Sequence, residues 1–371
     1  MTVDYTLYGG ELSLYTGKAR AYMRFKNLNW KEKIANRDVY KTIILPKIGA
    51  PIIPVLETAQ GEYIQDTTDI IDFLEARHPE FSVYPETPLQ RLVALMLEFY
   101  GDQWLTIPAM HYRWTKLDEQ YDFVMSEFGR LSAPDATLDE QIVIGEKTSR
   151  PFRGSVFALG ITEATIPEIE SVYLEFLGQL NLHFADHDYL LGSRPSIGDF
   201  GFMGPLYAHL GRDPVPKALM QDRAPNVYAW VERMNAPQPL SGEFLPDDAI
   251  PDTLLPVLAT LCRDQLPDTL DVLKHNSAFV ESNPGEKIPR VLGIHSFQTG
   301  AATGERMINS FDQWMFQRSW LHYHSLQGAD KIAADSLLDK IGGHEAMNVE
   351  IEHWLVRRAG QLELVEGARP N

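Results

Sequence analysis

The sequence has one cysteine, Cys262, in 371 residues, and this scarcity excludes several kinds of chemistry. A single cysteine forms no disulfide within the chain, and it provides neither a Cys-x-x-Cys redox pair nor a cysteine-rich zinc site. No run approaches the ~20 apolar residues of a membrane-spanning helix. The first ten residues lack a basic start followed by an apolar run, so we expect no signal peptide. These absences favour a cytoplasmic protein without a membrane partner.

Basic residues are also scarce, because 33 Lys and Arg stand against 51 Asp and Glu and leave a formal net charge of −18. A protein this acidic repels nucleic-acid phosphates and anionic membrane surfaces, so neither is an expected partner. Charged residues make up only 23% and hydrophobic residues 44%, which excludes disorder over most of the length. At roughly 100–200 residues per domain, the length predicts two or three domains.

One stretch runs against this charge. Nine basic residues and only two acidic ones lie between Lys18 and Lys47. Such a cluster in an acidic protein could receive a small anion. For each of its members taken alone, a solvated charge on a helix surface is the simpler interpretation.

The order of predicted elements divides the chain into three parts. Strand patterns at residues 5–8, 30–34, 52–56 and 63–64 alternate with helical patterns at 15–28 and 66–77, and a short helix is possible within 37–48. Beyond Pro85 and Pro88, helical patterns cover residues 89–105, 137–147, 166–185, 197–210 and 226–234. A proline-rich break near residue 240 precedes further helical patterns at 252–275, 306–326 and 345–359. We therefore expect parts at residues 1–86, 87–240 and 241–371.

Four motifs give this order a family resemblance. They are LYGGELSLYTGKAR at residues 7–20, APIIPVL at 50–56, YIQDTTDIIDFLE at 63–75 and YLLGSRPSIGD at 189–199. In order and spacing they resemble the cytosolic glutathione transferases over about residues 1–240. The resemblance implies an α/β thioredoxin-like domain and an all-α domain, and the helical patterns beyond residue 240 predict a mostly helical C-terminal extension.

The same resemblance implies a function. The expected activity is glutathione transfer, in which the glutathione thiolate attacks an electrophilic small molecule. The expected assembly is a cytoplasmic homodimer. A glutathione-dependent isomerase, dehalogenase or lyase is an alternative within the family. A non-catalytic interaction protein that retains the fold is an alternative from a different class.

The resemblance also implies where glutathione binds. A cis Pro54 turns the chain so that the backbone of Val55 pairs with the extended tripeptide. Gln65 and Asp66 open a helix whose free N–H groups attract the γ-glutamyl carboxylate, and Asp66 can accept from the amine. The family more often has Ser or Thr at the second of these two positions. A cation for the glycine carboxylate could come from any one of three residues: Arg37, Lys41 or Lys47.

The thiol has to be activated, since a thiol with a reference pKa near 8.5 is little ionised at neutral pH. Lowering that pKa by two units needs about 2.7 kcal/mol of preferential stabilisation of the thiolate. By resemblance, Ser13 at the start of the first helix is the candidate hydroxyl, with helix capping as the alternative. Tyr8, Tyr15 and Thr16 are further candidates.

Two aromatic residues, Trp104 and Tyr112, lie where the family places its electrophile pocket, although an aromatic stripe at helical spacing more often belongs to a core. Ser196 and Asp199 have the Ser-x-x-Asp spacing of a capping box, so we expect them to stabilise a helix.

We expect no metal site. The histidines in the C-terminal part of the chain, His322, His324, His344 and His353, lack the i, i+4 spacing of a metal-binding pair on a helix.

The extension carries large apolar residues from Leu254 onward. Five prolines between residues 251 and 289 are expected to break its first half into short elements. Short helices persist only with packing partners. We therefore expect the extension to dock on the helical domain.

Overall fold

The computed structural model describes residues 3–236, 240–358 and 361–365, and the chain begins with a four-stranded mixed sheet. The strand order is β2–β1–β3–β4, built from β1 (Tyr5–Gly9), β2 (Trp30–Ile34), β3 (Val55–Thr58) and β4 (Tyr63–Gln65). β1 is parallel to β2 and antiparallel to β3, and β3 is antiparallel to β4. This is the small mixed sheet of the expected thioredoxin-like domain.

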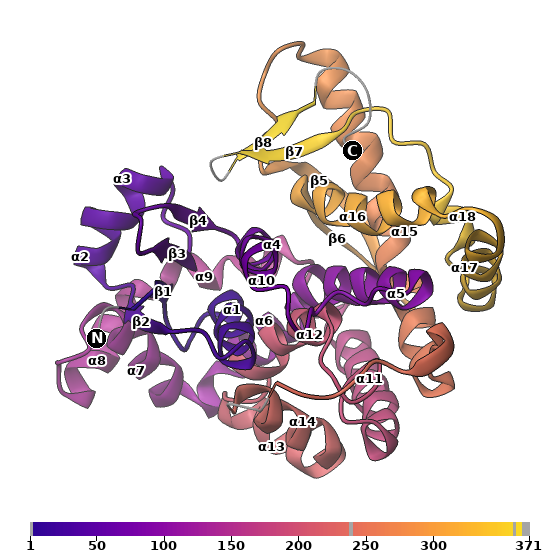
Figure 1. Ribbon diagram of the computed structural model, residues 1–371. Helices are drawn as coiled ribbons and strands as arrows, with labels where there is room; N and C mark the ends of the chain where they lie inside the picture. The colour runs from indigo at the N-terminus through magenta and orange to yellow at the C-terminus, as the bar shows by residue number, and fades with distance from the viewer. Residues whose placement is uncertain (1–2, 237–239, 359–360, 366–371) are drawn as a thin grey trace.

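Alternate side chains of the sheet enter two separate cores, because successive residues of a strand point to opposite faces. Leu7 and Leu56 join the large core that includes α1 (Leu14–Phe25) and α4 (Thr67–Arg77). Tyr8 and Val55 join a smaller core with α2 (Arg37–Val39), the π-helical turn η1 (Tyr40–Ile44) and α3 (Leu45–Ile48). The sheet therefore has helices on both faces (Figure 1).

A helical domain follows the sheet. Its elements are α5 (Pro88–Phe99), η2 (Tyr100–Trp104), α6 (Thr106–Trp114), η3 (Leu117–Glu119), α7 (Tyr121–Ser132), α8 (Leu138–Thr148), α9 (Arg150–Arg153), α10 (Ser155–Ala158), α11 (Ile166–Asp186), α12 (Ile197–Ala208), α13 (Pro214–Arg223) and α14 (Pro225–Asn235). Every residue of α12 is buried, and the helix packs against α1, α5 and η2. Burial on all sides explains why α12 is apolar around its whole circumference.

The extension contains more strand than expected. Its elements are η4 (Pro246–Asp248), η5 (Asp252–Leu254), α15 (Leu255–Ser282), β5 (Val291–Thr299), β6 (Ala302–Asn309), α16 (Phe311–Ser325), α17 (Gly328–Ile341), α18 (His344–Met347), β7 (Leu355–Arg358) and β8 (Gln361–Leu364). β5 pairs with β6 and β7 with β8, both antiparallel.

Three expectations for the extension were wrong. The helix predicted from residue 306 begins only at Phe311, because Arg306 lies in β6 opposite His295. The helix predicted over residues 345–359 is a short turn of helix followed by β7. Pro267 does not end α15, which is 28 residues long and contains this proline in its interior. We attribute the continuity of α15 to its buried apolar face, whose packing outweighs the lost hydrogen bond.

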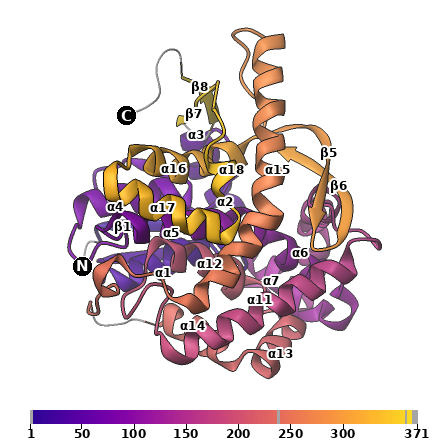
Figure 2. The same cartoon turned by 90° about the vertical axis from the view of Figure 1, so that its right-hand side faces the viewer.

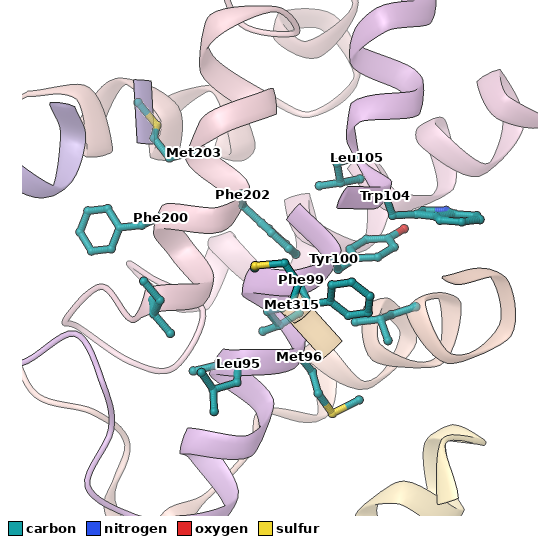
Figure 3. Close-up of a cluster of buried hydrophobic side chains, with 14 of the residues drawn as sticks. Leu95, Met96, Phe99, Tyr100, Trp104, Leu105, Phe200, Phe202, Met203 and Met315 are labelled. Atoms are coloured by element: carbon teal, nitrogen blue, oxygen red, sulfur yellow. The ribbon is translucent and has the colours of Figure 1, made fainter. Parts of the chain in front are cut away.

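The extension docks on the helical domain, as predicted. α16 and α17 pack against α5, and the rings of Phe99 and Phe316 lie 6.1 Å apart. Met315 of α16 belongs to the same buried cluster as Leu95, Met96 and Phe99 of α5 (Figure 3). Figure 2 shows α15, α16 and α17 covering one side of the molecule. No helix in the described ranges has both the length and the apolar character needed to cross a membrane.

Candidate functional site

A cavity of about 350 Å³ lies where the extension meets the N-terminal domain. The N-terminal domain contributes the start of α4, the segment before β3 and the start of α1 to its wall. Asp102 and Gln103 of η2 line it as well. The extension supplies residues 287–290, two residues of α16 and the β7–β8 hairpin. Figure 1 shows this hairpin reaching from the extension toward β4 and α4.

The start of α4 supplies the polar end of the cavity. Asp66 is the N-cap residue, and its carboxylate accepts a hydrogen bond of 2.9 Å from the backbone N–H of Thr68. Its backbone has φ 86° and ψ 138°, a conformation that costs free energy in any residue other than glycine. Thr67, the first residue of the helix, lines the cavity beside it. Unpaired N–H groups and the helix dipole make this end favourable for a carboxylate.

An arginine from the other end of the chain adds a full positive charge to this region. Arg357 lies in β7, its side chain is only 5% exposed, and it lines the cavity. Its guanidinium donates to the backbone oxygen of Gln65 at 2.7 Å, to the Gln65 side-chain oxygen and to the carboxylate of Asp69. Burial raises the pKa of Asp69 to about 6, against the opposing effect of Arg357. The contacts tie the hairpin to the start of α4.

The segment before β3 supplies the apolar wall. The peptide bond between Ile53 and Pro54 is cis, as the resemblance implied, and Ile52, Ile53 and Pro54 all line the cavity. Val55 does not line it. Its side chain is fully buried, and its strand is paired with β1 on one side and β4 on the other. The residue exposed to the cavity next to Pro54 is therefore Ile53 rather than Val55.

The start of α1 brings one hydroxyl to the cavity. Tyr15 lines it and donates a hydrogen bond of 3.0 Å to the backbone oxygen of Asp102, while burial raises the pKa of its phenol. Ser13 is the N-cap of α1, accepts from the backbone N–H of Thr16 at 3.2 Å and does not line the cavity. Tyr8 donates to Glu57 at 2.5 Å in the smaller core, and Thr16 is fully buried.

Asp102, which lines the cavity, belongs to a buried ionic cluster with Lys18 and Glu98, which do not line it. Asp102 accepts from Lys18 at 2.6 Å, and Lys18 also donates to Glu98 at 2.8 Å. Burial raises the pKa of the Asp102 carboxyl to about 7, with Lys18 opposing the shift and Glu98 adding to it. A carboxyl with such a pKa can exchange a proton at neutral pH.

The sequence of the two N-terminal domains agrees with a known family. Residues 7–82 match the family model for the glutathione S-transferase N-terminal domain, and residues 162–237 match the model for the glutathione S-transferase C-terminal domain. These two segments support a glutathione S-transferase assignment for the N-terminal part of the chain, about residues 7–237. Comparison with curated protein sequences gives no match.

Solved structures of the same family are similar at low identity. A glutathione S-transferase from Rhodospirillum rubrum F11 is 19% identical, with a TM-score of 0.41, and the match covers 67% of this chain and 96% of that chain. The beta-etherase LigF from Sphingobium sp. strain SYK-6 is 17% identical, with a TM-score of 0.45 and coverage of 64% and 96%. A glutathione S-transferase from Methylobacterium radiotolerans, in complex with glutathione sulfonate, is 20% identical, with a TM-score of 0.38 and coverage of 64% and 92%.

At the start of α4 a second pair of residues fits the two-residue motif that our sequence analysis assigned to Gln65 and Asp66. An acidic or amide residue followed by a small polar one fits Asp66 and Thr67, because Asp66 is the N-cap and Thr67 the first helical residue. The side-chain oxygen of Gln65 already accepts from Arg357. Thr67 was missed, although the family preference for Ser or Thr at the second position was a usable signal.

The cations expected for the glycine carboxylate lie elsewhere. Arg37, Lys41 and Lys47 are exposed and do not line the cavity. The cations that line it are Lys287, Arg290 and Arg357, all from the extension. Lys287 donates to the side-chain oxygen of Gln361 at 2.6 Å, which joins the two parts of the extension that cover the cavity.

The aromatic residues expected to form an electrophile pocket are in the core. Trp104 is 4% exposed and its ring packs edge-on against Phe297 of β5, 6.2 Å away. Tyr112 is 5% exposed and packs against Tyr173 at 5.4 Å. Neither lines the cavity, because the extension and α11 fill the space beside them.

Ser196 and Asp199 form the predicted capping box of α12, away from the cavity. The carboxylate of Asp199 accepts from the backbone N–H of Ser196 at 2.8 Å and from its hydroxyl at 2.9 Å. The other carboxylate oxygen accepts from the backbone of Leu190 and the indole of Trp230. Burial raises the pKa of Asp199 to about 6. These contacts give the pair a structural role.

Proposed function

We propose that the protein is a glutathione-dependent transferase that binds the tripeptide in this cavity and directs its thiolate at an electrophilic small molecule. The observation that carries the proposal is the pairing of Arg357 with the start of α4 beside the Ile53–Pro54 segment. A γ-glutamyl group carries a carboxylate and an amine on the same carbon. The helix start and Arg357 would attract the carboxylate, and Asp66 would accept from the amine.

The other ends of glutathione have partners in the same wall. Ile53 lines the cavity, and its backbone would pair with the cysteinyl unit in the manner of an added strand. Lys287 and Arg290 are the candidate cations for the glycine carboxylate. The thiolate would lie near the start of α1, where Tyr15 is the hydroxyl on the cavity and Ser13 stays a prediction from the resemblance.

Isothermal titration of the full-length protein with glutathione tests the binding proposal. Arg357→Met removes a charge-assisted contact, so we expect affinity to fall about 10- to 100-fold. Arg358→Met is the matched control, because the neighbouring arginine is 74% exposed and does not line the cavity. No binding heat with the parent protein at millimolar glutathione, or equal affinity in the two variants, would contradict the proposal.

The thiolate absorbance of bound glutathione tests the activating group. If Tyr15 stabilises the thiolate, Tyr15→Phe should raise the pKa of the bound thiol and Ser13→Ala should leave it unchanged. The opposite result would assign the role to Ser13. Tight binding without an activated thiol in the parent protein would instead favour the non-catalytic interaction protein.

Two further expectations rest on the resemblance alone. They are a homodimer and a cytoplasmic location. Light scattering coupled to size-exclusion chromatography measures the first. The boundaries at residues 86 and 240 also stay predictions, which limited proteolysis can test.

A further inference from the structure

Three donor groups of the kind that bind transition metals meet on the extension, outside the glutathione cavity. Asp271 and His275 lie four residues apart on α15 and so share one face of the helix. His295 projects from β5, which packs against α15. One donor atom of each of these residues lies within 4.8 Å of the other two.

The spacing of the donors suits a tetrahedral ion. His295 Nδ1 lies 2.9 Å from Asp271 Oδ2, and His275 Nε2 lies 3.4 Å from the same oxygen. Zinc bonds of 2.0–2.1 Å at tetrahedral angles separate two donor atoms by about 3.3 Å. The planes of the two imidazole rings are 88° apart, so the rings meet edge to face and do not stack. Two imidazoles and a carboxylate favour zinc-like cations over magnesium or calcium.

A second carboxylate lies behind the buried histidine. Asp268 Oδ1 is 3.3 Å from His295 Nε2, and Asp268 Oδ2 is 3.3 Å from Arg306 Nη1. The His295 and Asp268 side chains are only 3% and 2% exposed, and within the described residues neither His295 Nε2 nor Asp268 Oδ1 has a well-aligned hydrogen bond. A proton on Nε2 facing Asp268 would leave the lone pair of Nδ1 free for a metal, which is how a carboxylate commonly orients a metal-binding histidine.

The exposure and the charge of the three donor side chains also suit a metal ion. The side chains of Asp271 and His275 are 38% and 43% exposed, so an ion can reach the cluster from solvent. Asp271 supplies one negative charge directly, and Asp268 adds a nearby carboxylate that shares the Arg306 guanidinium with Asp312. Three protein ligands leave the fourth tetrahedral position to water.

We propose that Asp271, His275 and His295 bind one zinc-like divalent transition-metal ion, and that Asp268 is the positioning residue for His295. The ion would fasten the β5–β6 hairpin to α15. The site shares no residue with the glutathione cavity, so it stands or falls independently of the proposed transferase function.

Zinc titration of tag-free, chelator-treated full-length protein tests this proposal, without glutathione because its thiol binds zinc. We expect one equivalent of zinc to bind and to raise the melting temperature. His275→Ala should weaken zinc binding at least roughly 10-fold and remove the thermal shift. His344→Ala is the matched control, because His344 is 41% exposed and lies beside Asp335 and Asp339.

Asp268→Asn tests the positioning role. It should weaken zinc binding roughly 10- to 100-fold and alter the visible spectrum of the cobalt-substituted protein, which a purely structural role would not do.

His275 is partly exposed, so the His275→Ala variant should fold, and circular dichroism checks this. The proposal is overturned if the parent binds no zinc at micromolar concentration. It is also overturned if folded His275→Ala binds as the parent does, or if His344→Ala loses as much affinity.

Discussion

Replacement of Lys18 by methionine should destabilise the protein far more than the loss of an ordinary ion pair. The Lys18 side chain is 0% exposed, and those of its partners Glu98 and Asp102 are 1% and 3% exposed. Methionine retains much of the apolar length of lysine but removes the cation. The two buried carboxylates then lose their closest positive charge, and among the residues that the structure describes the Arg318 guanidinium, 3.6 Å from Glu98, is the cation that remains in contact.

We expect Lys18→Met to lower the free energy of unfolding by about 3–5 kcal/mol, the usual effect of breaking a buried pair from one side. Urea denaturation and the melting temperature measure it. Lys340→Met is the control, because the side chains of Lys340 and its partner Asp252 are 61% and 91% exposed, and such a pair contributes about 0–1 kcal/mol.

The loss of stability caused by Lys18→Met should also depend on pH. Since burial already raises the pKa of Asp102 to about 7, the carboxyl can escape the missing cation by binding a proton. Lys18→Met should therefore be less damaging at about pH 5 than at about pH 8. Equal losses for Lys18→Met and Lys340→Met, or a loss that grows as pH falls, would refute this account of the cluster.

Three further predictions follow from buried groups. Burial raises the pKa of the Asp312 carboxyl to about 7, above its unfolded value near 3.9, so the contribution of Asp312 to stability falls as pH rises from about 4 to 7. The free energy of unfolding of Asp312→Asn should therefore rise relative to that of the parent over this range, as denaturation curves can measure. A difference between the two free energies that does not change with pH would contradict the prediction. Ser196→Ala should lower stability by about 0.5–2 kcal/mol, more than Thr137→Ala at the exposed capping box of α8, and an unchanged melting temperature would argue against the cap. Deletion of residues 249–371 exposes the α5 surface under α16 and α17, so we expect aggregation or a large fall in melting temperature; a soluble, equally stable truncation would mean that the extension is a separate module.

The N-terminal half could be read from the sequence because its signals are local. The strand predicted at residues 30–34 is β2 as observed, and the helix predicted to open at Asp66 has that residue as its N-cap. Caps, turns and short apolar runs act over a few residues, so a single sequence contains them.

The extension was harder because its strands depend on partners. Residues 302–309 bury only two positions, and they become a strand only when paired with β5. The sequence-based prediction began the following helix at residue 306, and so it covered the last four residues of this strand. At Pro267 a local signal gave the wrong prediction. Proline usually breaks a helix, but the tertiary packing of α15 outweighs this local effect.

In the candidate site, too, residues in local motifs could be identified from the sequence, whereas residues brought in by long-range contacts could not. Pro54 and Asp66 were identified from motifs, whereas Thr67, which follows Asp66 and also lines the cavity, was not considered. Arg357 could not be found from spacing at all, since nothing in the sequence indicates that β7 returns to α4. Lys287 and Arg290 were not considered for the same reason, and the cations that were considered, Arg37, Lys41 and Lys47, do not line the cavity.

The contact between Arg357 and Gln65 spans 292 residues, and this has a consequence for biosynthesis. At ~5–20 residues per second, roughly 15–60 s pass between translation of Gln65 and translation of Arg357. The sheet and α4 can form during that interval, but the wall of the cavity that β7 supplies does not yet exist. A stop codon shortly before residue 357 would leave most of the chain intact but remove that wall. The complete cavity therefore cannot form until residues 357–362 have been translated, long after the sheet and α4.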